Sequence, residues 1–270
     1  MRTRFAIFSD LDGTLLDHHT YSFEAALPVL KKVKSRQIPV ILITSKTRAE
    51  TEAISRKMGL NYPFIVENGG AIFIPRRHFN LEGMKKLSKG VYEVIQLGVP
   101  YRRIRRALKM IRDQANIRLV GFSDLKPSQV ASISGLDQNT ARLAKKREYD
   151  EPFILEQPGR IKEIRIRARE LGLQVVKGGR FYHLIGNNDK GKAVRILKDL
   201  YERKYGSIKS IGLGDSSNDL PMLKEVDIPV LIRRADGKYE KLPELKSLVK
   251  TKHSGPNGWA EAINKILDIR

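Results

Sequence analysis

The feature that most restricts the fold of this chain is the segment Asp10–Thr14, which reads Asp-Leu-Asp-Gly-Thr. It directly follows the apolar run Phe5–Phe8, which predicts a buried strand. In open α/β sheets, ligands bind at the carboxyl ends of the strands. Because residues i and i+2 of an extended chain point the same way, Asp10 and Asp12 can face one ligand. One carboxylate could attack phosphorus while the other handles the proton of the leaving group.

The first 80 residues alternate apolar runs with segments of helical periodicity. We expect strands at 5–8, 39–43 and 63–66, and helices at 23–36 and 48–58. Gly59 is a natural end for the second helix. Strands joined by helices imply right-handed crossovers and a parallel sheet.

The middle of the chain has a different character. Residues 86–186 carry 21 Lys and Arg against 10 Asp and Glu. Short strands are expected at 91–97, 152–156, 173–177 and 181–185, with helices at 101–115, 127–134, 139–147 and 159–171. The doubly wound pattern then resumes with a helix at 190–204 and strands at 210–214 and 228–232. The predicted fold is α/β: a doubly wound, Rossmann-like parallel-sheet core formed by residues 1–84 and 187–270, with an α+β domain inserted at 85–186.

Composition narrows the possible settings of the protein. The 270 residues include no cysteine, which excludes disulfides and thiolate metal sites. We see neither a signal peptide nor an apolar run of the roughly 20 residues that span a bilayer, so we expect a cytoplasmic protein without a membrane partner. High Lys, Arg and Glu content suggests a thermophile. The net charge of +21 has three explanations. The organism decorates its protein surfaces with Lys and Arg, the charge attracts an anionic substrate or, less readily, it binds nucleic acid.

Polar side chains follow the predicted strands at four places, and a doubly wound sheet would bring them together. These places are Asp10 and Asp12, Thr44 and Ser45, Lys190 at a helix start, and Asp215 and Asp219. Asp10 suits a nucleophile and Asp12 a general acid and base. Thr44, Ser45 and Lys190 suit phosphate binding.

The acidic residues also suit Mg²⁺, which prefers hard oxygen ligands. Asp10, the backbone carbonyl of Asp12 and Asp215 would supply ligands. Asp219, or the side chains of Ser216 and Asn218, would complete or orient the set.

Each of these signals has an ordinary explanation when it stands alone. An Asp-x-Asp pair is usually a capped loop, Thr-Ser an N-cap, and a lysine at a helix start a solvated side chain. An EF-hand is excluded because Leu15 and Tyr21 stand where its loop needs Gly and Glu. The order of the four clusters and their place after strands favour one shared site.

In that order, the clusters resemble the four motifs of the haloacid dehalogenase superfamily phosphatases, and the insert resembles their C2-type cap. The resemblance covers the whole chain. It implies Asp10 as the nucleophile, Asp12 as the acid and base, and Asp10, Asp12 and Asp215 as Mg²⁺ ligands. Thr44 and Lys190 would contact the phosphate.

A narrower resemblance is to the mannosyl-3-phosphoglycerate phosphatases, which release phosphate to give the compatible solute mannosylglycerate. It rests on segments 44–48, 66–70, 146–151 and 178–183. The resemblance implies a phosphoric monoester hydrolase that works through an aspartyl-phosphate intermediate on a small anionic substrate. Another sugar phosphate, or a phosphomutase cycle, remains an alternative.

The expected substrate carries a carboxylate as well as a phosphate, so its recognition needs cations besides Lys190. Arg180 follows Gly179, where the backbone can approach a ligand closely, and its guanidinium suits a carboxylate. Lys46 and Asn68 are further candidates for substrate binding. We expect His183 to be structural, and the sequence does not indicate an oligomeric state.

Overall fold

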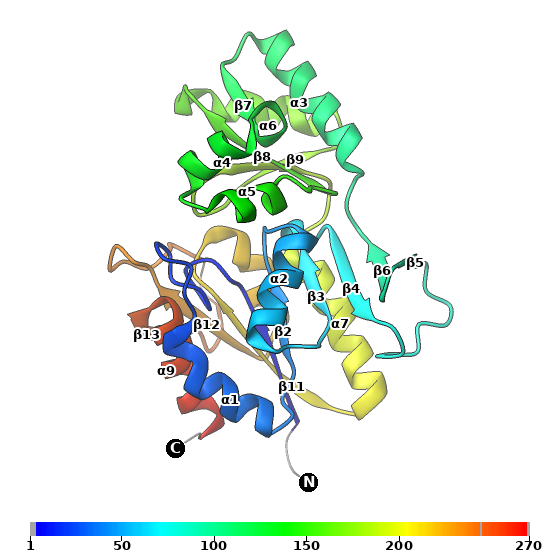
Figure 1. Ribbon diagram of the computed structural model, residues 1–270, viewed down its shortest axis with the longest axis vertical. Coiled ribbons are helices and arrows are strands. Elements are labelled where there is room, and N and C mark those ends of the chain that lie inside the picture. The colour runs from blue at the N-terminus through cyan, green and yellow to red at the C-terminus, as the bar shows by residue number, and fades with distance from the viewer. Residues whose placement is uncertain (1–3, 244, 269–270) are drawn as a thin grey trace.

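The computed structural model describes residues 4–243 and 245–268, and within them the chain forms a large and a small β-sheet. Each sheet carries its own helices. The two resulting units are stacked in Figure 1, and we call the lower one the core and the upper one the cap. Strand β1 (Arg4–Ser9) begins, and helix α9 (Gly255–Leu267) ends, at the end of the core away from the cap.

The large sheet has parallel strands in its centre and an antiparallel extension at one edge. Its nine strands within the described residues run in the order β13 (Val249–Ser254), β12 (Ile228–Arg233), β11 (Ile208–Gly214), β1 (Arg4–Ser9), β2 (Val40–Ile43), β3 (Phe64–Val66), β4 (Ala71–Pro75), β6 (Tyr92–Gln96) and β5 (Leu87–Lys89). From β13 to β3 all neighbours are parallel, and Ile7 of β1 lies between Ile211 and Val40. The carboxyl ends of these strands therefore meet at one edge of the sheet.

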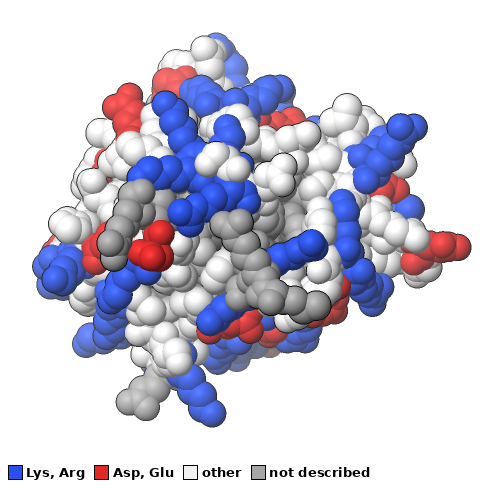
Figure 2. All heavy atoms as spheres, turned by 90° about the horizontal axis from the view of Figure 1, so that it is seen from below, with Lys and Arg blue, Asp and Glu red and all other residues white. Residues whose placement is uncertain are grey.

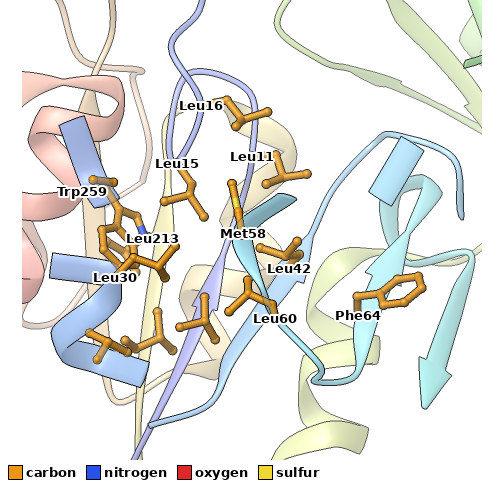
Figure 3. Close-up of a cluster of buried hydrophobic side chains, with 14 of the residues drawn as sticks. Leu11, Leu15, Leu16, Leu30, Leu42, Met58, Leu60, Phe64, Leu213 and Trp259 are labelled. Atoms are coloured by element: carbon orange, nitrogen blue, oxygen red, sulfur yellow. The ribbon is translucent and has the colours of Figure 1, made fainter. Parts of the chain in front are cut away.

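Helices cover both faces of the large sheet, because its central strands are apolar on both sides. One face carries α1 (Leu27–Ser35), α2 (Arg48–Met58) and α9 (Gly255–Leu267); the other carries α7 (Lys190–Tyr205) and α8 (Leu220–Glu225). Trp259 of α9 is fully buried and packs with Leu30 and Leu213 (Figure 3). A capping box at Thr47 starts α2, and Gly59, with φ 61°, ends it as predicted.

The cap is an antiparallel sheet with helices. Its strand order within the described residues is β7 (Leu119–Gly121), β8 (Asp150–Leu155), β10 (Tyr182–Ile185) and β9 (Gln174–Lys177). Helices α3 (Tyr101–Ala115) and α6 (Ile161–Glu170) pack on this sheet through a shared apolar cluster, and α4 (Pro127–Ser134) and α5 (Gln138–Ala144) form a second one. Short 3₁₀ helices lie at 24–26, 67–69, 122–124, 158–160 and 217–219.

The structure corrects the boundary that we expected at residue 85. Strands β5 and β6 hydrogen-bond to the large sheet through β4, with Ile95 opposite Ile72, and Val94 and Ile95 are buried in the core. The chain therefore crosses to the cap after β6 and returns after β10. The two crossings touch: the Gly98 N–H donates to the Gly70 carbonyl (2.7 Å), and the Gly186 backbone packs against Val99. Residues 1–3 and 269–270, which we assigned to the core, lie outside the described residues.

Positive charge extends well beyond the edge where the strands end. Lys and Arg side chains, interspersed with acidic ones, are spread over the end of the molecule opposite the cap (Figure 2). Exposed residues such as Arg36, Arg203 and Lys209 are examples. Among the described residues, no helix combines the length and the apolar character needed to cross a membrane.

Candidate active site

Four loops of the core meet below the cap, as the order of the strands requires. Asp10 follows β1, Thr44 follows β2, Asp215 follows β11, and Lys190 begins α7. The Asp10 N–H donates to the Leu213 carbonyl (2.9 Å), which ties the first loop to the neighbouring strand. Gly13 has φ 75°, and a Cβ there would lie 2.5 Å from Asp215 Oδ2, so only glycine fits between the two acidic loops.

Lys190 joins two of the acidic residues. Its Nζ donates to Asp10 Oδ1 and to Asp219 Oδ1, each at 2.6 Å, and its side chain is 1% exposed. Asp219 accepts the backbone N–H groups of Asp215 and Ser216 with its other oxygen, both at 3.0 Å. Asp219 is thus engaged on both oxygens and fixes the loop that carries Asp215.

Asp10, Asp215 and Asp219 form a buried cluster with Lys190 that we call the acidic site. One carboxylate oxygen from each lies within 4.8 Å of the other two. Burial, together with the charges of neighbouring carboxylates, raises the pKa of Asp10 and raises the pKa of Asp215 to about 7. Three carboxylates against one ammonium leave an excess of negative charge. This set of hard oxygen donors fits a divalent cation such as Mg²⁺.

Asp12 lies at the rim of the acidic site, with its side chain 36% exposed. Lys46 Nζ lies 2.9 Å from Asp12 Oδ1 and 4.0 Å from Glu50 Oε1, over the ring of Tyr21. Burial disfavours the ammonium of Lys46, but the carboxylates of Asp12 and Glu50 outweigh burial and raise its pKa. Asp12 therefore reaches the space under the cap while Lys46 steadies it.

The hydroxyl-bearing residues divide into two groups. Thr44 is buried, and its Oγ1 accepts the Lys46 N–H (3.0 Å), so its own proton is left to donate. Ser45 lines the cavity. Ser216 Oγ donates to Asn218 Oδ1 (2.6 Å), so in this structure these two side chains bind each other at the edge of the acidic site.

A cavity lies between the core and the cap, directly above the acidic site. It is lined from the core by Asp10, Asp12, Lys46, Asp215 and Ser216, and from the cap by Arg147, Gly179, Arg180, Phe181 and His183. Acidic groups thus form its floor, and cations and aromatic rings lie along its walls and roof.

The family follows from comparison with known proteins. Residues 7–243 match the family described as haloacid dehalogenase-like hydrolase. The chain belongs to this family. The predicted fold, a doubly wound α/β core with an inserted cap, is confirmed.

Relatives and solved structures agree with this assignment. A Methanococcoides burtonii protein named glucosyl-3-phosphoglycerate/mannosyl-3-phosphoglycerate phosphatase is 47% identical over 97% of this chain and 96% of its own length. The mannosyl-3-phosphoglycerate phosphatase of Pyrococcus furiosus is 38% identical over 90% and 96%. The crystal structure of Thermoplasma acidophilum 0175 superposes over the full length of both chains with a TM-score of 0.68; at 19% identity this likeness concerns the fold.

In this haloacid dehalogenase-like hydrolase, Arg180 binds one backbone carbonyl of the core and one of the cap. Its Nη2 donates to the His18 carbonyl (2.5 Å), its Nη1 to the Ser134 carbonyl, and its guanidinium lies over the ring of Tyr21. Gly179 beside it lines the cavity. Arg180 therefore lies at the cavity wall, where it joins the first core loop to the end of α4.

The structure places Asn68 differently from the other predicted substrate contacts. Asn68 is buried, is not among the residues that line the cavity, and donates from Nδ2 to Asp150 Oδ2 of the cap (2.7 Å). Its position is between the cap and the loop of Asn218, behind the cavity wall.

Sequence reasoning missed a second group of buried charges, which we call the interface network: Glu67 of the core with Arg147, Asp150 and His183 of the cap. Arg147 lies 3.1 Å from Asp150 Oδ1 and 3.8 Å from Glu67 Oε2, and His183 Nδ1 lies 2.9 Å from Asp150 Oδ1. Glu67 also accepts the N–H of Tyr149 at 2.7 Å. The only signal for this group was that its members fall in segments 66–70, 146–151 and 178–183, which carried the narrower resemblance.

The two carboxylates of the interface network are shifted in opposite directions. Burial raises the pKa of Glu67 to about 8, although Arg147 opposes this. Burial also acts on Asp150, but His183, Arg147 and the Asn68 amide outweigh it and hold the pKa of Asp150 below its usual range. Asp150 is therefore a buried carboxylate that stays ionised.

Proposed function

We propose that this protein is a Mg²⁺-dependent phosphatase that hydrolyses the phosphate monoester of glycosyl-3-phosphoglycerates, with mannosyl-3-phosphoglycerate converted to mannosylglycerate. The observation that carries the chemistry is the Asp10 carboxylate, held 2.6 Å from Lys190 in a cluster of three carboxylates under a cap. The substrate class is supported by the names of relatives that are 47% and 38% identical over most of the chain.

The reaction proceeds in two displacements. Asp10 attacks phosphorus, an Asp10–phosphorus bond forms, and the bond from phosphorus to the glycerate oxygen breaks as Asp12 gives that oxygen a proton. A water molecule then attacks phosphorus of the aspartyl phosphate while Asp12 takes its proton, the Asp10–phosphorus bond breaks, and inorganic phosphate leaves. Asp12 can serve both steps because its side chain reaches the cavity.

Lys190 and the loop hydroxyls orient the reacting groups. Lys190 holds one oxygen of Asp10, and with Thr44 it suits the charge on the transferred phosphoryl oxygens. Asp10, the backbone carbonyl of Asp12 and Asp215 would hold Mg²⁺, with Asp219 fixing the Asp215 loop. When bound, the metal neutralises negative charge shared by the phosphate and the acidic site.

The walls of the cavity suit a substrate with two anionic groups. Lys46, Arg147 and Arg180 line it around the acidic floor. A phosphate at Asp10 leaves these cations to attract the carboxylate of the glycerate. The absence of cysteine and the abundance of Lys and Arg support our view that the protein works in the reducing cytoplasm of a thermophile.

A phosphate-release screen with Mg²⁺ tests this function. The substrates are mannosyl- and glucosyl-3-phosphoglycerate, 3-phosphoglycerate, mannose 6-phosphate and glucose 6-phosphate. We expect kcat/KM for a glycosyl phosphoglycerate to exceed that for the others by about a hundredfold, because only it carries the phosphate, the carboxylate and the sugar together. Equal values on simple hexose phosphates would contradict the proposed substrate, and no phosphate release from any of them would contradict the activity.

A further inference from the structure

One chain of hydrogen bonds runs from the cap to the loop that carries Asp215. Asp150 Oδ2 accepts from Asn68 Nδ2 (2.7 Å), Asn68 Oδ1 accepts from Asn218 Nδ2 (3.0 Å), and Asn218 Oδ1 accepts from Ser216 Oγ (2.6 Å). Asp150 belongs to the cap, Asn68 follows β3, and Asn218 lies between Asp215 and Asp219 in a third part of the chain. The chain of bonds therefore exists only when the cap sits on the core.

The ionised carboxylate of Asp150 sets the direction of every bond in this chain. A carboxylate can only accept, so the NH₂ group of Asn68 must face Asp150 and its oxygen must face Asn218. The NH₂ group of Asn218 then faces Asn68, and its oxygen faces the Ser216 hydroxyl. Arg147, in contact with Asp150, supplies the positive charge that keeps it ionised, and His183 Nδ1 donates a hydrogen bond to the same carboxylate.

Asn68 is also connected to the other loops of the acidic site. Its backbone N–H donates to the Thr44 carbonyl (3.0 Å), and its carbonyl accepts from Asn188 Nδ2 (3.1 Å), two residues before Lys190. One buried residue thus touches the segments that carry Thr44, Lys190 and Asp215. A change in the Asn68 side chain can therefore alter the positions of all three segments.

The backbone around Asn68 is strained, and contacts with the cap hold it. Glu67 and Asn68 have φ values of 50° and 56°, a left-handed conformation that costs non-glycine residues free energy. The carboxylate of Glu67 accepts the backbone N–H groups of Glu148 (3.0 Å) and Tyr149 (2.7 Å) from the cap. Strain of this kind persists where surrounding contacts determine the conformation, and here the cap supplies them.

We propose that Asp150 is a positioning residue that couples seating of the cap to the arrangement of the Asp215–Asp219 loop, acting through Asn68 and Asn218. Asp150 does not line the cavity, so it acts without touching the substrate. A seated cap presents a fixed acceptor to Asn68, which orients the Asn218 amide and the Ser216 hydroxyl beside Asp215. An unseated cap removes this acceptor, so both amides are free to rotate. The inference builds on the proposed phosphatase function.

A side-chain exchange separates this role from a purely structural one. In Asp150→Asn, the new amide can present either its NH₂ group or its oxygen to Asn68. The direction of the hydrogen bonds from position 150 to Ser216 is then no longer fixed. Asn68→Asp alone places two carboxylates face to face. In the double variant Asp150→Asn/Asn68→Asp, the new amide donates to Asp at position 68, which still accepts from Asn218, so the original orientation of Asn218 returns.

We expect Asp150→Asn to lower kcat about tenfold with KM for the glycosyl phosphoglycerate changed less than about threefold, since charged hydrogen bonds are lost without a substrate contact. The double variant should recover at least half of the lost kcat on a logarithmic scale. Glu163→Gln is the matched control: it removes a carboxylate of α6 that is bound to Arg160 and Arg167 within the cap, and should leave kcat unchanged. A wild-type kcat in Asp150→Asn, or a double variant no better than Asp150→Asn when both are folded, would overturn the proposal.

Amide hydrogen exchange gives a second readout that needs no substrate. In Asp150→Asn, peptides covering 214–220 and 44–46 should exchange faster than in the wild type, whereas peptides of α9 should not change. The double variant should restore protection. Unchanged exchange at 214–220 in Asp150→Asn would overturn the proposal even if the protein is an active phosphatase. If the wild type released no phosphate but exchange were still faster in Asp150→Asn, the result would support the coupling of the cap to the Asp215–Asp219 loop. It would reject only the proposed phosphatase function.

Discussion

The acidic site and the interface network are both buried clusters of charge, but they are balanced differently. In the acidic site, three carboxylates share one lysine, and the pKa values of Asp10 and Asp215 rise. In the interface network, Glu67 and Asp150 are matched by Arg147, His183 and backbone N–H groups. The first cluster is short of positive charge and suits a cation from outside. The second is closer to balance, although burial raises the pKa of Glu67 to about 8, and it holds the cap to the core.

The largest effect is expected when one carboxylate of the acidic site is neutralised. Asp10→Asn should lower kcat by about a thousandfold or more, because the amide is a poor nucleophile. Its thermal stability should not fall, because the change removes one of three crowded negative charges while keeping an acceptor for Lys190. Phosphate release and thermal unfolding measure the two effects. Asp113→Asn, at an exposed position of α3, should change neither, and substantial turnover by Asp10→Asn would remove it as the nucleophile.

Removing the cation of the interface network should instead lower the stability of the fold. Arg147→Met leaves Glu67 and Asp150 buried without their arginine, so the free energy of unfolding should fall by about 3–5 kcal/mol. Denaturant unfolding measures this loss. Arg112→Met, which breaks only partly exposed ion pairs with Asp113 and Asp124, should cost less than about 1 kcal/mol. Equal losses in the two variants would mean that the network does not hold the structure together.

Magnesium should act on the acidic site alone. At a hundred times its Kd, Mg²⁺ should stabilise the folded protein by about 2.7 kcal/mol, seen as a higher Tm that EDTA reverses. Asp215→Asn should lose most of this shift because it removes a carboxylate of the cluster. Glu163→Gln should keep it. A Tm shift of the same size in Asp215→Asn would place the metal elsewhere.

The smallest effect, about 1 kcal/mol for each pH unit, is the pH dependence of the interface network. The pKa of Glu67 is about 8 in the folded protein, above the value near 4.5 of a free glutamate. Between these values the folded state binds more protons than the unfolded state, so this side chain costs stability as the pH rises. Glu67→Gln removes that cost.

We therefore expect the stability of Glu67→Gln relative to wild type to increase from pH 5 to pH 8, by about 1 kcal/mol per pH unit. Chemical denaturation across this range measures it. For Glu163→Gln, whose pKa is lowered by Arg160, the difference should stay flat over the same range. A Glu67→Gln difference that stays constant from pH 5 to pH 8 would show that Glu67 is ionised throughout.

The parts of the fold predictable from the sequence were those with local signals. Apolar runs followed by polar loops located β1, β2 and β11, and their order alone brought Asp10, Lys190 and Asp215 together. The catalytic and metal-binding roles of these residues stay predictions. The boundary at 85 was wrong because β5 and β6 join the sheet edge with a mixed pattern: Leu87 is 45% and Val91 68% exposed.

Contacts between the cap and the core had no local signal. Glu67 meets Tyr149, and Asn68 meets Asp150, across 82 residues of sequence, and each pair depends on how two separate units are placed. The same holds for Arg180, which meets His18 across 162 residues. A side chain's type and its neighbours in sequence indicate that it is polar; they do not indicate its partner.

The two crossings between the core and the cap lie against each other at Gly98, Val99 and Gly186. The cap and the core are therefore joined through a single narrow junction. A bulkier residue at position 98 would have its Cβ 2.9 Å from that of Tyr149. It would therefore force the segments at this junction apart. The junction between the cap and the core can therefore be altered at Gly98, which does not line the cavity.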